Sequence, residues 1–194
     1  MNDYSLIESF FSLTGIFFLS LILLSSYVSV GLWIKYAKKK NLYDLPNIRS
    51  SHSHATPIGG GLMIAILFLS AIIFYYYHGL IEINYFLALI ITGSLIGTIG
   101  FLDDLYNLSA KLRIMFHFIA SIIGIYLLGG MPAIDIFGFV IHQGFLISLF
   151  GIFFLVWMIN LYNFMDGING IASIETITTT LGIALIILSS NSTN

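Results

Sequence analysis

Six long apolar runs, separated by short polar stretches, make up most of the chain. We place them at about 10–34, 60–78, 84–102, 113–130, 145–161 and 171–190. Each run approaches the roughly 20 residues that a helix needs to cross a bilayer. The runs are too long and continuous for barrel strands, and lipid cannot satisfy open backbone groups. The pattern therefore predicts an all-α, polytopic membrane bundle, with one transmembrane domain over residues 1–194.

Composition supports this fold class. Hydrophobic residues make up 58% of the chain and charged residues only 8%, against roughly 25% charged residues in a soluble domain. The chain has no cysteine, which excludes disulfides and thiol chemistry. We expect the first run to be a retained span rather than a signal peptide, because the residues before it include Asp3 and Glu8 but no Lys or Arg. The composition therefore argues against a water-soluble globule.

All seven basic residues fall in alternate loops of the six-span pattern. They are Lys35, Lys38, Lys39, Lys40, Arg49, Lys111 and Arg113. Because Lys and Arg accumulate in cytoplasmic loops, we expect three cytoplasmic loops, at about 35–59, 103–112 and 160–172. Both ends of the chain are then expected outside. Polar residues that need an explanation all map to the same three loops, so the pattern predicts a site on the cytoplasmic face.

Two adjacent acids, Asp103 and Asp104, end the third apolar run. Ionisable residues beside the hydrocarbon boundary tend to be functional, and two neighbouring carboxylates bind a proton more tightly or attract a divalent cation. On a helix they point about 100° apart, so both reach one cation only if the chain partly unwinds. The alternative is a pair of solvated acids at a helix end. We favour a functional pair.

The first loop ends in the sequence R-S-S-H-S-H-A-T-P-I-G-G-G, from Arg49 to Gly61. Glycines at a helix start expose backbone N–H groups, which suit a phosphate. The alternative is a flexible turn that leads into the helix. His52 and His54 by themselves are too weak a signal for a metal.

The third loop contains the sequence N-L-Y-N-F-M-D-G-I-N-G, in which Asn160, Asn163 and Asp166 are spaced by three. At that spacing the three side chains share one side of a helix end. Buried amides need hydrogen-bonding partners, which a nucleotide or a sugar would supply. A helix cap and turn would explain Asp166 but not the two asparagines.

Two further residues follow the second loop. Lys111 is an interfacial anchor or a phosphate contact. His117 shares a helix face with Arg113 and is expected to be a packed polar residue rather than a ligand.

Together, the three loops resemble those of the polyprenyl-phosphate N-acetylhexosamine-1-phosphate transferases, of the family 4 glycosyltransferase type. The resemblance covers about residues 40–175 and is closer to the initiators of O-antigen and other surface glycans. It implies transfer of a sugar-1-phosphate from a UDP-sugar to polyprenyl (undecaprenyl) phosphate, with release of UMP. It also implies Mg²⁺, with Mn²⁺ as an alternative, and the cytoplasmic face of the bacterial inner membrane. The implied partners are UDP-N-acetylhexosamine, polyprenyl phosphate and the lipid bilayer, with no nucleic acid.

The resemblance also implies roles for the residues of this chain that stand at the family's motif positions. The implied catalytic and metal-binding residues are Asp103, Asp104 and Asp166. The implied substrate-binding residues are His52, Thr56, Pro57, Gly59, Gly60, Lys111, Asn160, Asn163 and Asn169.

The family's later segments have no counterpart in these 194 residues. They carry a further Asp in a G-D-x-G-S-like context, which is the main metal ligand that the resemblance implies, and a His-rich loop. We therefore expect a missing C-terminal half, or a second copy of the chain in a homodimer, to complete the site. The alternative is a non-catalytic membrane fragment or scaffold. A transporter would place ionisable residues near the midplane of the bilayer, where these spans have almost none.

Overall fold

The computed structural model describes residues 13–44, 54–165 and 170–191. Its helices are α2 (Leu13–Lys39), α3 (Gly60–Tyr77), α4 (Ile83–Tyr106), α5 (Ala110–Leu127), α6 (Phe145–Met165) and α7 (Ile171–Asn191). Helices α2 to α6 are each long and apolar enough to cross a membrane, whereas the apolar stretch described in α7, Ile171–Ile186, is shorter. The predicted all-α membrane bundle is thus confirmed.

Three helices extend further than the apolar runs predict. Helix α2 continues to Lys39, α4 to Tyr106 and α6 to Met165. The three polar loops therefore start later than predicted. The acid pair lies on α4, and Asn160 and Asn163 lie in the last turns of α6, at the helix end that their spacing predicted. The physical reason is that a helix satisfies its backbone groups internally wherever it lies, while polar side chains near its end can still reach water.

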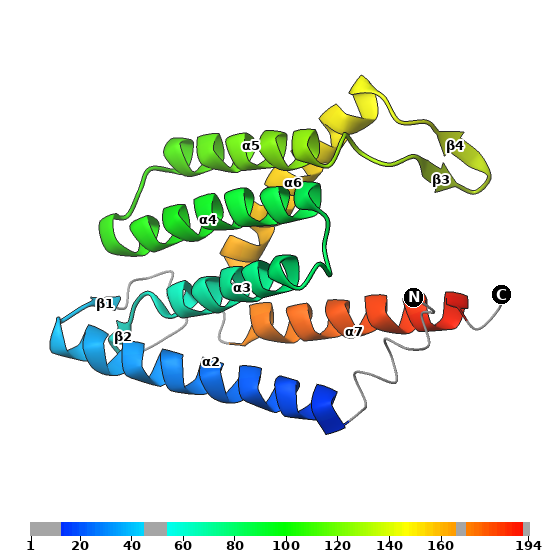
Figure 1. Ribbon diagram of the computed structural model, residues 1–194. Coiled ribbons are helices and arrows are strands. Elements are labelled where there is room, and N and C mark those ends of the chain that lie inside the picture. Colours follow the sequence, from blue (N-terminus) through cyan, green and yellow to red (C-terminus); the bar gives the residue numbers. More distant parts are fainter. Residues whose placement is uncertain (1–12, 45–53, 166–169, 192–194) are drawn as a thin grey trace.

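Helices α2, α3, α4 and α5 lie side by side in chain order and alternate in direction (Figure 1). Helix α6 runs obliquely across this layer and packs against α5, and α7 contacts α6. Small residues allow the closest approach: a Cβ added at Gly97 of α4 would lie 3.2 Å from the Cβ of Ala65 on α3. This is the helix packing expected between small residues in a membrane.

Two short antiparallel hairpins interrupt the predicted loops. Strand β1 (Tyr43–Asp44) pairs with β2 (Thr56–Pro57), and β3 (Ile134–Ile136) pairs with β4 (Phe139–Ile141). The second hairpin turns through Phe137 and Gly138, whose φ angles are 53° and 88°. Two consecutive positive φ angles suit the tight twist of a two-residue hairpin turn.

Every Lys and Arg among the described residues lies at or near one end of the bundle. This end comprises the last turns of α2, the β1–β2 hairpin and the turn between α4 and α5, and we call it the basic end (Figure 1). The β3–β4 hairpin, the first residues of α2 and the last residues of α7 lie toward the opposite end (Figure 1). This alternation agrees with the predicted order of loops.

Candidate functional site

A tight turn at the basic end brings the start of α5 back onto the end of α4. Asn107 ends α4 in the left-handed conformation, with a φ of 49°, and its N–H donates to the carbonyl of Asp103 at 2.8 Å. Asn tolerates this conformation better than most residues. Ser109 then caps α5, because its Oγ accepts from the N–H of Leu112 at 3.3 Å. The turn therefore directs the first residues of α5 toward the acids of α4.

An ion pair joins α4 to α5 across this turn. Nη1 of Arg113 lies 2.5 Å from Oδ2 of Asp103, and the two side chains are 31% and 18% exposed. The short distance is typical of a charge-assisted hydrogen bond, and partial burial protects it from screening by salt. The sequence pattern placed Arg113 in a cytoplasmic loop and on one helix face with His117, but it did not predict this contact. Its signal was an acid and a base on either side of a turn with a capping serine.

A second polar contact joins α5 to α6. His117 is buried, and its Nδ1 lies 3.1 Å from Nδ2 of Asn160. The same Nδ2 donates to the carbonyl of Val156 at 2.7 Å. Because this nitrogen is the amide donor, Nδ1 of His117 accepts, and the neutral ring carries its proton on Nε2. The expectation that His117 is a packed polar residue agrees with this position.

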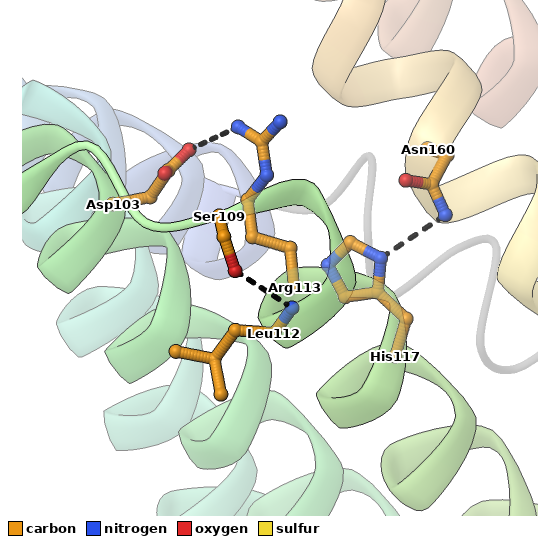
Figure 2. A network of polar contacts seen from close by, with 6 residues as sticks. All are labelled: Asp103, Ser109, Leu112, Arg113, His117 and Asn160. Atoms are coloured by element: carbon orange, nitrogen blue, oxygen red, sulfur yellow. Dashed lines mark hydrogen bonds and ion pairs between the residues drawn. The ribbon is translucent and has the colours of Figure 1, made fainter.

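The two contacts form a line of polar side chains across three helices. Arg113 and His117 are one turn apart and share a face of α5. Figure 2 shows Asp103 of α4 on one side of them and Asn160 of α6 on the other. Helix α5 thus connects Asp103 of the acid motif with Asn160 of the asparagine motif. Neither Arg113 nor His117 was among the predicted site residues.

The adjacent acids do not converge. Helix α4 is continuous through both residues, so their side chains leave it about 100° apart. Asp103 is directed to Arg113, whereas Asp104 is exposed. Among the described residues, no group of three His, Cys, Asp or Glu side chains is placed to hold a metal ion. Partial unwinding, the condition for both acids to reach one cation, is not seen.

The described end of the first loop, directly before α3, packs against α2 and α4. Gly59 precedes α3 with a φ of 81°, and an added Cβ would lie 2.9 Å from Cζ2 of Trp33 and 3.1 Å from Cε2 of Phe101. Nε1 of Trp33 donates to the carbonyl of Ile58 at 2.8 Å. Conformation and packing together therefore require a glycine here. Phe101 lies two residues before Asp103, so this packing places the loop beside the acid-bearing end of α4.

The remaining predicted residues are distributed over the same end or fall outside the description. Thr56 and Pro57 form β2, Gly60 begins α3, and no atom lies within 4 Å of a Cβ added at Gly60. Lys111 is exposed in the first turn of α5, and Asn163 is exposed near the end of α6. His52, Asp166 and Asn169 lie outside the described residues.

Comparison with known proteins identifies a family. The profile described as Glycosyl transferase family 4 matches residues 86–194. This region includes both acids and Asn160 but not the first loop. No curated protein and no solved structure matches the chain. Since the match covers more than half of the sequence, the chain belongs to glycosyl transferase family 4, the polyprenyl-phosphate sugar-phosphate transferase family that its polar motifs resemble.

Proposed function

We propose that the basic end of this bundle carries out sugar-1-phosphate transfer from a UDP-N-acetylhexosamine to polyprenyl phosphate. The observation that supports this most is the meeting of acidic, basic and amide side chains at one end of membrane-spanning helices. A lipid phosphate and a soluble nucleotide can react only where the bilayer surface meets water. By the distribution of Lys and Arg, the basic end faces the cytoplasm. The family resemblance adds two further parts of the proposal: the membrane is the inner membrane of a bacterium, and the lipid product enters surface-glycan synthesis.

In the proposed reaction, an oxygen of polyprenyl phosphate attacks the β-phosphorus of the UDP-sugar. A new P–O–P bond forms, the bond between the β-phosphorus and the bridging oxygen breaks, and UMP leaves. Two anionic substrates must approach each other, so positive groups are needed near them. Lys111, exposed at the positive N-terminal end of α5, is suited to a phosphate.

Amide side chains are suited to the sugar and the nucleotide. Asn160, Asn163 and Asn169 supply both donors and acceptors from the third motif. Thr56, Pro57, Gly59 and Gly60 would shape the first loop around the donor, with His52 close to them in the sequence. Of these, Gly59 is buried, so it would act by setting the shape of the turn.

Magnesium, or Mn²⁺ in its place, would offset the phosphate charge when bound. The carboxylate of Asp104 is an oxygen ligand of the kind these ions prefer, and it is exposed at the basic end. The described residues provide no three-ligand group, so this donor set fits such an ion only in part. Asp166, a second copy of the chain or a further segment would supply the other ligands.

Product formation tests the proposal directly. Membranes that contain the chain would be mixed with UDP-N-acetylhexosamine labelled in the sugar, undecaprenyl phosphate and Mg²⁺, and the chloroform-soluble label and the released UMP would be measured. We expect equal amounts of the two products, and loss of both after Asp104→Asn. The matched control is Asp135→Asn, the same change at the β3–β4 hairpin. Product that survives Asp104→Asn would refute the assignment of this site.

A non-catalytic scaffold is the competing function. The observation in its favour is that the described residues include no complete set of metal ligands. Binding separates the two: a scaffold would bind neither labelled UDP-sugar nor Mg²⁺ in equilibrium dialysis, whereas a transferase would bind both, and Asp104→Asn would weaken the binding of Mg²⁺.

A further inference from the structure

The two adjacent acids occupy different environments. The carboxylate of Asp103 is 18% exposed and lies against the guanidinium of Arg113 at 2.5 Å. Asp104, the next residue, is exposed and is turned about 100° around α4. The motif presents the acids as a pair, but the fold gives them separate surroundings.

Helix α5 makes polar contacts with both motif-bearing helices. Arg113 reaches α4 through Asp103, and His117, one turn further along, reaches α6 through Asn160 (Figure 2). Both contacts lie on one face of α5. The acid motif and the asparagine motif are therefore held in relation to each other by two side chains that belong to neither motif.

We propose that Arg113 and His117 form a positioning bridge, which holds the acid motif of α4 and the asparagine motif of α6 in relation to each other. This inference rests on the proposed transferase function. Asp104 and Asn163, exposed on α4 and α6, are the groups that the bridge holds at a set separation.

Partial burial makes the bridge sensitive to the loss of one partner. Removing one member of a buried ion pair leaves a charge without compensation, and α5 would then shift relative to α4. A displacement of about 1 Å between reacting groups can lower a rate by about 10²-fold. A bridge of this kind therefore affects turnover more than substrate binding.

His117 has a matched pair of variants. His117→Asn places an amide oxygen near the position of Nδ1 and can still accept from Asn160, whereas His117→Leu cannot. We expect His117→Leu to lower kcat by about tenfold or more with KM for both substrates changed little, and His117→Asn to rescue kcat. Equal kcat values for the two variants would contradict the bridge.

A distance measurement makes the test independent of activity. The chain has no cysteine, so spin labels can be attached at Tyr106→Cys on α4 and Phe164→Cys on α6, both exposed sites. Pulsed electron paramagnetic resonance should show a shifted or broader distance distribution after His117→Leu or Arg113→Gln, and no change after Asp104→Asn. An unchanged distribution in the first two variants refutes the bridge. A shifted one in a chain that makes no product supports the bridge and refutes the transferase.

Discussion

The two ends of the bundle use polar side chains in opposite ways. At the basic end, Arg113 and His117 contact residues of α4 and α6 that are 10 and 43 positions away. At the opposite end, three side chains bond to backbone groups: Asp135 accepts from the N–H of Gly138 at 2.7 Å, Ser148 accepts from the N–H of Met131 at 3.2 Å, and Gln143 donates to the carbonyl of Gly129. The first arrangement joins side chains of separate helices, and the second fixes the backbone of the connection between α5 and α6. Only the contacts at the basic end can hold side chains from distant motifs at a set separation. We therefore expect the reaction to take place at the basic end.

The apolar surface also differs between the ends. At the tip of the β3–β4 hairpin, the relative exposure of Phe137 is 101% and that of Phe139 is 81%. At the basic end, Trp33 packs against Phe101 with ring centroids 5.7 Å apart, and both cover Gly59. The pair Trp33 and Phe101 is thus packed at the basic end, whereas Phe137 and Phe139 are exposed at the hairpin. A substitution at the first should therefore disturb more than a similar one at the second.

Reversing one charge at each end should give the largest difference. Lys111→Glu would place a negative group where the proposed substrates bring phosphate, and we expect a loss of about 10²-fold to 10³-fold in kcat/KM. His142→Glu adds a negative charge at the opposite end, beyond the range of unscreened interaction, and should leave kcat/KM within about twofold. The measurement is the formation of chloroform-soluble product at several substrate concentrations. Equal losses would show that Lys111 has no special role.

Two glycines with positive φ angles separate backbone strain from packing. Gly59→Ala should destabilise the fold by about 3 kcal/mol, since left-handed strain contributes about 1–2 kcal/mol and the contact with Trp33 and Phe101 about 1–3 kcal/mol. Gly138→Ala has a similar φ but nothing within 4 Å of the added Cβ, so only about 1–2 kcal/mol of strain is expected. Thermal unfolding in detergent would give both values. A larger effect at Gly138 would contradict the packing of the first loop.

Removing a partly buried amide should have a moderate effect. Asn160→Leu leaves Nδ1 of the buried His117 without its partner, which costs about 2 kcal/mol of stability. Gln143→Leu removes the contact of an exposed side chain with the carbonyl of Gly129 and should change stability by less than about 0.5 kcal/mol. Chemical unfolding in mild detergent would compare them. Similar values would mean that the contact between α5 and α6 is no stronger than a surface contact.

The smallest effect is expected at the hairpin tip. Phe137→Ser changes a fully exposed side chain, so we expect less than about 0.5 kcal/mol in unfolding and unchanged product formation. Phe101→Ser is the matched change at the basic end, where it would open space against Trp33 and lower stability by about 3–5 kcal/mol. If Phe137→Ser reduced activity as much as Phe101→Ser, the hairpin would be part of the functional machinery.

Sequence patterns predicted the spanning helices well but not their ends. Apolar runs identify helices α2 to α6 because a bilayer demands a minimum length of apolar helix. Charged and amide residues, however, do not end a helix by themselves, and Asp103 and Asn160 remain helical. The β3–β4 hairpin was missed because its turn uses Phe137 in a conformation that a bulky residue rarely adopts.

The sequence predicted which residues belong to the candidate site, but it did not predict which of them contact one another. The acids, Lys111 and the asparagines stood out because polar residues beside a membrane need partners. The acid, the base and the serine between them hinted at a contact between Asp103 and Arg113, but the contact itself needs the left-handed Asn107 and the serine cap to reverse the chain. Likewise, the sequence identified Gly59 as a glycine at a helix start, but only the structure showed that it packs against Trp33.

By itself, the amino-acid sequence determined that the chain forms apolar helices long enough to span a bilayer, with its basic residues in alternate loops, because lipid imposes length and charge pattern locally along the chain. It also marked the acids as candidates. The fold decided that Asp103 faces Arg113, that His117 is buried against Asn160, and that adjacent acids point apart. Those relations depend on how helices distant in sequence pack, so each residue's partner is set by the whole bundle rather than by its neighbours in the chain.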